Sequence, residues 1–176
     1  MDSSSNSDLS DLVQAVQSDQ ELQQVVGTLA SYFGIDSIPE KDGYSEVRCS
    51  YDVSPALEKV RDELKKEYVA KKISDIVKTM VRHPGKVHYL SRRVSLLVFQ
   101  SGWSELAEIM GKENCYILIP SVIKGSGEVT IEERSTGRRT TAKFELNSKL
   151  IIRGSSSLWL PPQSKVVCIV LGAGKG

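Results

Sequence analysis

The 176-residue chain is poor in the residues from which metal centres and disulfide frameworks are usually built. It has three cysteines, widely separated and without a Cys-x-x-Cys pair, and two histidines, His83 and His88. This composition disfavours both a disulfide framework and a zinc site, so we expect no bound metal and no cofactor. There is no apolar run of about 18 residues, no signal-peptide pattern and no Asn-x-Ser/Thr sequon. The expected location is intracellular and cytoplasmic, with the nucleus as an alternative.

Catalytic signatures are equally scarce. The Gly-Ser-Gly at 125–127 lacks the outer spacing of a nucleophile elbow, and the glycine-rich end at 172–176 has no helix after it to complete a phosphate loop. Glu132 and Glu133 are adjacent on a predicted strand, so their side chains point to opposite faces and do not form an acid/base pair. We therefore expect a protein that is more often not an enzyme.

The three cysteines have different sequence surroundings. Cys115 and Cys168 lie in apolar runs, where burial raises the pKa of a thiol and makes it inert. Cys49 is the only one expected to be accessible, and its neighbours include no activating base. Core packing is the favoured interpretation for Cys115 and Cys168.

Charge is distributed unevenly along the chain. Residues 1–53 carry ten acidic and two basic residues, whereas the remainder carries 21 basic and 12 acidic residues, for a total of only +1. Such a division indicates either an anionic partner for the basic part or an acidic segment that covers a basic surface. That both faces are merely solvated is the remaining alternative.

The first 53 residues show helical patterns. Residues 1–7 lack apolar side chains and predict a disordered tail. Apolar residues spaced at i, i+3, i+4 and i+7 predict a helix over 9–16, and a capping box at 18–21 begins a second helix that ends near Gly34. Residues 35–53 read as a loop with an edge strand at 45–51. We expect an acidic helical arm and loop over 8–53.

The remainder begins with a helix and continues with strands. Ser54-Pro55 starts a long helix to about Arg82, whose apolar stripe changes face near Ala70 and predicts a kink. Apolar runs at 94–99, 115–119 and 166–171 predict central buried strands, and a helix over 103–110 between the first two suggests a parallel strand-helix-strand unit. Alternation at 128–134 and 140–146 predicts a hairpin, and 150–153 a further strand.

These elements predict the fold class. We expect an α+β protein in which N-terminal helices pack on a C-terminal mixed or antiparallel β-sheet or partial barrel. The expected division is a disordered tail at 1–7, the acidic helical arm and loop at 8–53, an α+β core at 54–171, and a flexible tail at 172–176.

Basic residues give the main functional hypothesis. Between residues 59 and 93 bases outnumber acids by 11 to 4, and their unpaired remainder clusters near residues 82–93. Arginines can contact phosphates and aromatic rings can stack on bases, so this cluster and the hairpin turn form a candidate nucleic-acid-binding surface. The candidate residues are Arg82, Lys86, His88, Tyr89, Arg92, Arg93, Arg138 and Arg139.

A second unusual segment is the apolar stretch Leu158-Trp159-Leu160 before Pro161-Pro162. It is expected either to plug one end of the sheet or to present Trp159 to a partner subunit or a membrane.

The favoured function is a non-enzymatic binding or assembly protein. Its basic surface would bind a polyanion, nucleic acid first, while the acidic arm would mediate self-association into a homo-oligomer. One alternative is a viral-type matrix or coat protein that contacts other subunits or an anionic membrane surface. The other alternative is a small enzyme whose site is assembled from residues distant in sequence.

Overall fold

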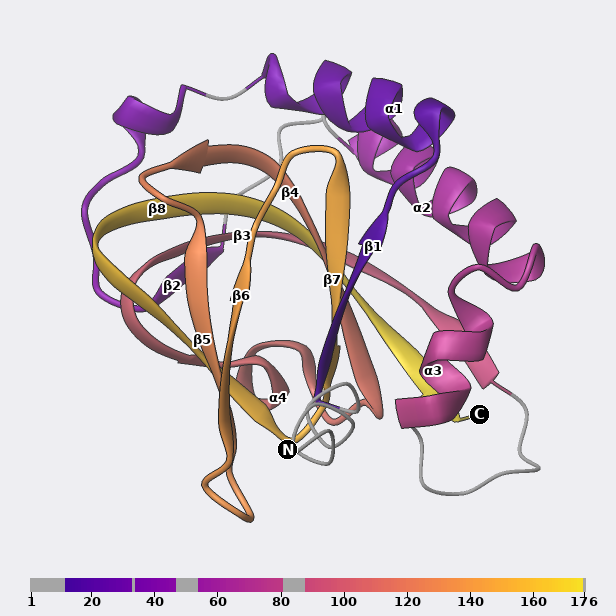
Figure 1. Ribbon diagram of the computed structural model, residues 1–176. Coiled ribbons are helices and arrows are strands. Elements are labelled where there is room, and N and C mark those ends of the chain that lie inside the picture. The colour runs from indigo at the N-terminus through magenta and orange to yellow at the C-terminus, as the bar shows by residue number, and fades with distance from the viewer. Residues whose placement is uncertain (1–11, 33, 47–53, 81–87, 176) are drawn as a thin grey trace, which may run out of the picture.

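The computed structural model describes residues 12–32, 34–46, 54–80 and 88–175. Two packed sheets of antiparallel strands form a nearly closed barrel, and helices cover one face of it (Figure 1). The larger sheet has the order β1-β7-β4-β8-β3-β2. The smaller sheet contains β5, β6 and the ends of β3 and β8 that pair with each other. The bounds are β1 Val13–Gln17, β2 Tyr44–Glu46, β3 His88–Glu105, β4 Cys115–Lys124, β5 Glu128–Glu133, β6 Arg139–Lys143, β7 Ser148–Arg153 and β8 Ser156–Lys175.

Two long strands, β3 and β8, belong to both sheets because each of them bends. The register between them shifts between Gln100 and Gly102, and Gln163 in the bend of β8 has a positive φ of 65°. Pro161 and Pro162 precede that residue, and prolines are tolerated where a strand bends rather than within a regular ladder. The bends turn one pair of strands into the corner of a barrel.

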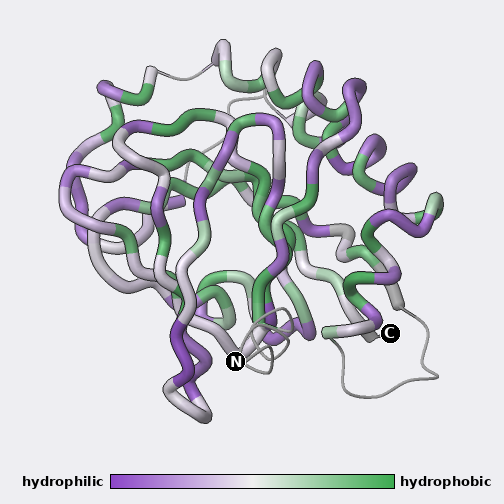
Figure 2. Tube along the Cα trace, in the orientation of Figure 1, coloured by the Kyte–Doolittle hydropathy of each residue, from purple (hydrophilic) through white to green (hydrophobic). Residues whose placement is uncertain are grey.

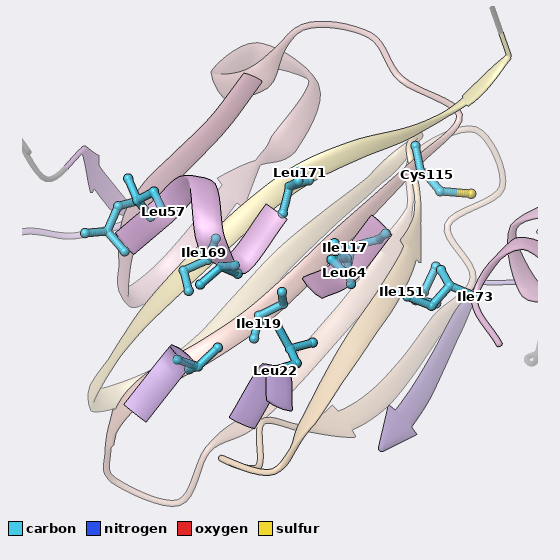
Figure 3. Close-up of a cluster of buried hydrophobic side chains, with 14 of the residues drawn as sticks. Leu22, Leu57, Leu64, Ile73, Cys115, Ile117, Ile119, Ile151, Ile169 and Leu171 are labelled. Atoms are coloured by element: carbon cyan, nitrogen blue, oxygen red, sulfur yellow. The ribbon is translucent and has the colours of Figure 1, made fainter. Parts of the chain in front are cut away.

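Helices occupy one side of the larger sheet. They are α1 (Gln20–Ala30), α2 (Ser54–Val69) and α3 (Ser74–Met80), with a short α4 (Leu106–Met110) between β3 and β4 and a 3₁₀ turn, η1, at Ile35–Ser37. Leu22, Leu57 and Leu64 on the helices meet Ile117 and Ile169 on the sheet in one buried cluster (Figure 3). This layer is a hydrophobic core outside the barrel.

The barrel interior holds a second buried cluster. Leu97 and Phe99 from β3, Tyr116 from β4, Ile131 from β5 and Leu158 from β8 are all fully buried in it. Alternate residues of each central strand therefore face the helices or the barrel interior, which explains their nearly continuous apolar sequence. Figure 2 shows hydrophobic residues along these strands and hydrophilic ones at the tip of the β5–β6 hairpin.

The expected fold class is wrong in its main feature. The chain is not a set of N-terminal helices packed on a sheet but a largely antiparallel, jelly-roll-like barrel. The helix expected over 9–16 is instead strand β1, which pairs with β7 from Val13 to Gln17. This strand has apolar contacts on both sides, so its side chains lack the two-residue period, and the chance spacing of its apolar residues resembles that of a helix.

The expected parallel strand-helix-strand unit is also wrong. β3 and β4 do not pair with each other, because β8 lies between them and is antiparallel to both. Trp103 lies in β3 rather than in a helix, and α4 has only five residues. Return from a distant part of the chain, which a local pattern does not encode, places β8 in the centre.

Other expectations agree with the structure. The long helix breaks between α2 and α3, where Lys71 has a positive φ of 66°. The hairpin is β5–β6, and the edge strand includes Tyr44–Glu46. The part expected as a flexible tail is instead the end of β8 up to Lys175, in which Gly172 and Gly174 are buried. Cys115 and Cys168 are buried, and Cys49 lies outside the described residues.

Among the described residues, no helix is long and apolar enough to span a membrane.

Candidate functional site

The buried charges of the larger sheet form a first group of polar contacts, and they support the fold. Lys149 on β7 and Glu67 on α2 are both almost fully buried, with Nζ 2.6 Å from Oε2. Lys149 also donates to the carbonyl of Gln17 and the hydroxyl of Ser18. Because an isolated buried charge is very costly, this pair has a structural role.

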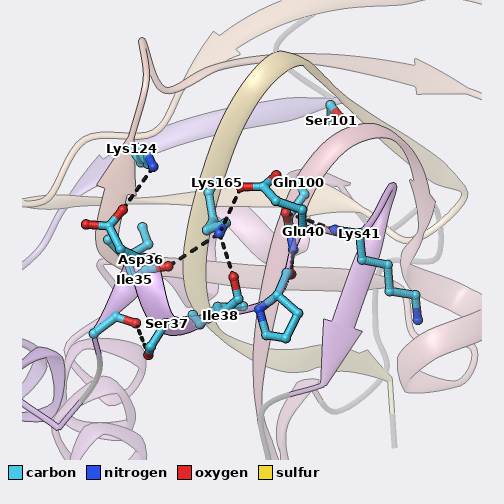
Figure 4. Close-up of polar contacts among 12 residues, drawn as sticks. Ile35, Asp36, Ser37, Ile38, Glu40, Lys41, Gln100, Ser101, Lys124 and Lys165 are labelled. Carbon is cyan, nitrogen blue, oxygen red and sulfur yellow. Dashed lines mark hydrogen bonds and ion pairs between the residues drawn. The ribbon is translucent and has the colours of Figure 1, made fainter.

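Lys165 on β8 holds the N-terminal segment against the barrel (Figure 4). Its Nζ donates to the carbonyls of Ile38 at 2.8 Å and Ile35 at 3.4 Å, and lies 3.4 Å from the Glu40 carboxylate. On the neighbouring strand, the buried Gln100 donates its amide to the carbonyl of Pro39. Residues 35–40 are therefore fixed over the bend of β8.

A third group lies at the end of β5. The buried Glu133 carboxylate accepts hydrogen bonds from Arg138, at 2.7 Å, from the Ser135 hydroxyl and from Arg153. Burial by itself would raise the pKa of Glu133. The hydrogen bonds from Arg138 and Ser135 and the two guanidinium charges outweigh burial and hold this pKa below its usual range.

These pairings correct the hypothesis of a basic surface. Arg138 is bound to Glu133, and Arg139 pairs with Glu132. Arg93 is exposed on β3. Arg82 and Lys86 lie outside the described residues, as do the side chains of His88, Tyr89 and Arg92. Of the predicted nucleic-acid-binding residues, the structure thus brings together only the two hairpin arginines, and both already have carboxylate partners.

The acidic segment is likewise part of the barrel rather than a separate arm. β1 completes one edge of the larger sheet, and α1 packs on α2. Asp19 pairs with Lys72 at 2.7 Å, and Asp36 pairs with Lys124 at 2.9 Å. The acidic segment therefore covers basic residues of its own chain, which was one of the two readings of the charge asymmetry.

The outer face of the smaller sheet, which in the described structure no helix covers, has a distinct composition (Figure 1). Strand register places Trp103, Trp159, Thr130 and Thr141 in one row across β3, β8, β5 and β6. The next row on the same face, two residues along each strand, contains Glu105, Ser157, Glu132 and Arg139. Two of these rows' members interact directly, because the Arg139 guanidinium lies 5.4 Å from the centroid of the Trp103 ring.

The first row borders a hollow in the surface. A depression of about 430 Å³ is lined by Trp159, Thr130, Thr141, Lys143 and Pro161, among others. Trp103, next to Trp159 in register, has 44% of its surface exposed. Both tryptophans of the chain therefore lie side by side on the same solvent-facing surface.

The segment predicted to contact a partner divides between the two sides of this sheet. Leu158 and Leu160 are fully buried in the barrel core, so they close the barrel as the first of the two sequence interpretations expected. Trp159 between them is half-exposed and faces outward. Alternation along β8 thus leaves only Trp159 available to a ligand.

A carboxyl pair lies at the edge of this face. Glu105 is next but one to Trp103 on β3 and forms an ion pair with Arg134. A hydrogen bond with the Glu108 carboxyl is the main reason that the pKa of Glu105 is raised, and the charge of Arg134 opposes this shift. Sequence reasoning missed this pair because it placed both residues in one longer helix.

The sequence comparisons give no relatives. No protein-family model matches the chain, and no curated protein matches it.

Solved structures with a similar fold do exist, and they are enzymes by description. The chain is similar to an oxidoreductase of the 2OG-Fe(II) oxygenase family from Burkholderia pseudomallei, with a TM-score of 0.55 and 10% identity over 93% of this chain and 84% of that one. For IDO from Bacillus thuringiensis the values are 0.53 and 7% over 97% and 92%. For a full-length Neurospora crassa protein in complex with alpha-KG and 5-formyluracil they are 0.50 and 10% over 93% and 74%.

At these identities the similarity shows the fold alone. It nevertheless overturns the favoured function, because the fold is shared with oxygenases and not with nucleic-acid-binding, coat or matrix proteins. It also removes the argument for a self-associating arm and the expectation that the chain's partners include no small molecule, since a neighbour of this fold holds alpha-KG.

The residues present do not fit the iron and 2-oxoglutarate that the fold suggests. Non-haem iron oxygenases bind Fe(II) through two histidines and one carboxylate, and this chain has only His83 and His88. His88 begins β3 opposite Lys175, and the described residues hold no group of three or more metal-ligating side chains. The buried cations Lys149, Arg153 and Lys165 all bind groups of the N-terminal elements instead of facing an acid site in the barrel.

Proposed function

We propose that this chain binds a neutral saccharide, without iron, on the uncovered face of its smaller sheet. The observation that carries the proposal is the position of Trp103 and Trp159, which lie opposite each other in register and face solvent beside a hollow. Trp159, predicted from sequence as a partner-binding residue, becomes part of this site.

The chemistry of the face suits a sugar ring. An indole offers a large, flat apolar surface, on which the C–H face of a pyranose can stack. Thr130 and Thr141, beside Trp159, add hydroxyl groups that both donate and accept hydrogen bonds. A ligand that is apolar on one face and hydroxylated at its edges matches this combination.

Two other ligand classes fit less well. A phosphate-rich ligand needs free cations, whereas Arg138, Arg139 and Arg134 are bound to carboxylates. A protein interface normally buries about 800 Å² on each partner with an apolar centre, and among the described residues Trp103 is the only large hydrophobic one strongly exposed on this face. A small neutral ligand is therefore favoured.

Tryptophan fluorescence provides a direct test, because both tryptophans of the chain lie in the site. Titration with a panel of neutral oligosaccharides should shift or quench the emission, and isothermal titration calorimetry should give a Kd. Covering roughly 100 Å² of indole at about 25 cal/mol per Å² contributes about 2.5 kcal/mol. We therefore expect Trp159→Ala and Trp103→Ala each to weaken binding by at least about tenfold, or 1.4 kcal/mol.

Tyr32→Ala is the matched control, since Tyr32 is an exposed aromatic residue that follows α1, away from this face. Circular dichroism and thermal melting verify that each variant is folded. The proposal is refuted if no neutral saccharide binds, or if Tyr32→Ala weakens binding as much as the tryptophan variants do.

The fold and the carboxyl pair favour a second candidate, hydrolysis of a glycosidic bond on the same face. A raised pKa keeps the Glu105 carboxyl protonated to a higher pH, so that it can donate a proton to the leaving oxygen. Glu132, paired with Arg139, would accept the proton of a water molecule whose oxygen bonds to the anomeric carbon as the C–O bond breaks.

The spacing of these two carboxylates is compatible with this reaction. Glu105 and Glu132 both lie opposite Ser157, one strand to each side, which separates their backbones by about 10 Å at ~4.8 Å per strand. Inverting glycosidases have carboxyl groups roughly 6.5–9.5 Å apart. Release of new reducing ends, lost in Glu105→Gln while saccharide binding persists, would support hydrolysis, and activity that survives in Glu105→Gln would refute it.

A further inference from the structure

The hollow beside Trp159 continues past the edge of the smaller sheet. A second hollow, of about 760 Å³, is lined by residues from Lys124 to Glu128, by the bend of β8 from Pro161 to Lys165, and by Glu40. The two hollows share Glu128 and Pro161 as lining residues. Together they form one groove from Trp103, across Trp159, to Gln163.

The walls of this groove have a fixed shape. Gln163 and Gly125 both have positive φ, at 65° and 96°, in the two turns that face each other. At Gly127 a Cβ atom would lie 2.6 Å from the Phe144 carbonyl oxygen, so the turn at 125–127 requires glycine there. On the opposite side, Lys165 holds the carbonyls of Ile35 and Ile38, which fixes the chain that leads into Glu40.

The charges along the groove are balanced. Lys124 forms an ion pair with Asp36, and Lys165 forms one with Glu40. Lys143 lies directly opposite Glu128 in register. The exposed side chains of Gln163 and Ser126 add an amide and a hydroxyl, which hydrogen-bond to neutral hydroxylated ligands. A strongly anionic ligand would meet as many carboxylates as ammonium groups.

From this geometry we infer that the groove binds an extended, neutral oligosaccharide chain of several units rather than a single sugar. The inference rests on the proposed saccharide binding. The row from Trp103 to Thr141 alone crosses four strands, about 14 Å at ~4.8 Å per strand, and the second hollow lengthens it further. The first units stack on the tryptophans, and later units reach Gln163.

Affinity as a function of chain length tests this inference. Screening the full chain on a printed array of neutral and sulfated oligosaccharides identifies the linkage, with maltose- and cellulose-type oligomers as the first probes. Calorimetry then compares the disaccharide, tetrasaccharide and hexasaccharide of that linkage. We expect Kd to fall by at least about tenfold from disaccharide to hexasaccharide, and the sulfated oligosaccharides to bind more weakly than the neutral ones.

Gln163→Gly is the decisive variant. It removes the amide, while the positive φ of this position suits glycine, so the turn should keep its shape. We expect it to weaken hexasaccharide binding by at least about fivefold and to leave disaccharide binding unchanged. Gln24→Ala, which removes an exposed amide from α1, is the control and should alter neither.

The outcomes separate the two claims. Equal affinity for disaccharide and hexasaccharide, with both abolished by Trp159→Ala, overturns the extended groove and leaves the tryptophan site intact. Tighter binding of sulfated than of neutral oligosaccharides overturns the assignment of a neutral ligand. Absence of binding to every glycan on the array overturns the proposed function and with it this inference.

Discussion

The buried ion pair between Lys149 and Glu67 gives the sharpest test of how the helical layer is attached to the barrel. Both side chains are at most 2% exposed, and their charged atoms are 2.6 Å apart. Burial is the main cause that lowers the pKa of Lys149, and Glu67 opposes it by favouring the charged form. Glu67→Gln removes that support and leaves an ammonium group buried without a counter-charge.

We expect Glu67→Gln to reduce the free energy of unfolding by about 3–5 kcal/mol, the usual result of breaking a buried pair from one side. The double variant Glu67→Leu with Lys149→Met removes both charges. It still leaves the Asp19 amide and the Ser18 hydroxyl without the partners they have now, at about 1–3 kcal/mol for a buried group. The double variant should therefore be more stable than Glu67→Gln alone.

Urea unfolding at pH 7, followed by circular dichroism and extrapolated with a common m-value, measures these differences. Lys149→Met completes the double-mutant cycle and gives the coupling energy between the two side chains. A loss below about 1 kcal/mol in Glu67→Gln would match a solvent-exposed pair. That result would refute the claim that this pair is buried under α2.

Four further results are expected. Because the folded pKa of Glu133 lies below its unfolded value of about 4.3, this carboxylate stabilises the fold above that pH and the contribution is lost as pH falls through the folded pKa; in Glu133→Gln, urea unfolding between pH 3 and 7 should show a weaker acid dependence. Gly154→Ala should destabilise strongly, since its Cβ would lie 1.9 Å from the Glu113 carbonyl oxygen, whereas Gly27→Ala in α1 meets no atom within 4 Å and should raise Tm; similar Tm changes would contradict this argument. Burial raises the pKa of Cys115 to about 12, so at pH 8 a thiol reagent should modify it only after unfolding; rapid labelling of the native protein at this position would contradict its burial. Addition of Fe(II) or Mn(II) with 2-oxoglutarate should leave Tm unchanged, and a rise that requires both would show a metal site that the described residues do not provide.

The proposed site shows why sequence reasoning reached only part of the function. Trp159 attracted attention as an apolar residue beside two prolines, but nothing in the local pattern linked it to Trp103, 56 positions earlier. Strand register between β3 and β8 brings the two rings together. The same holds for Glu105 and Glu132, which share a face only because β8 separates β3 from β5.

The hypothesis of a basic surface failed for a related reason. A linear count shows that acids and bases are segregated along the chain, and it assigns no distance between them. The fold brings Asp19, Asp36 and Glu40 of the acidic segment onto Lys72, Lys124 and Lys165. Opposite charges attract, so the segregation in sequence becomes neutralisation in space.

The sequence by itself determined the elements whose signals are local. These include the helices at Gln20–Ala30 and Ser54–Val69, the break near Ala70, the β5–β6 hairpin, the central apolar strands and the inert cysteines, because each depends on spacing or on neighbours within a few turns. Only the tertiary structure decided that β8 lies at the centre, that β1 is a strand, and that two tryptophans share one open face. Those features depend on pairing between segments far apart in the chain, where register and burial on both sides outweigh local preference.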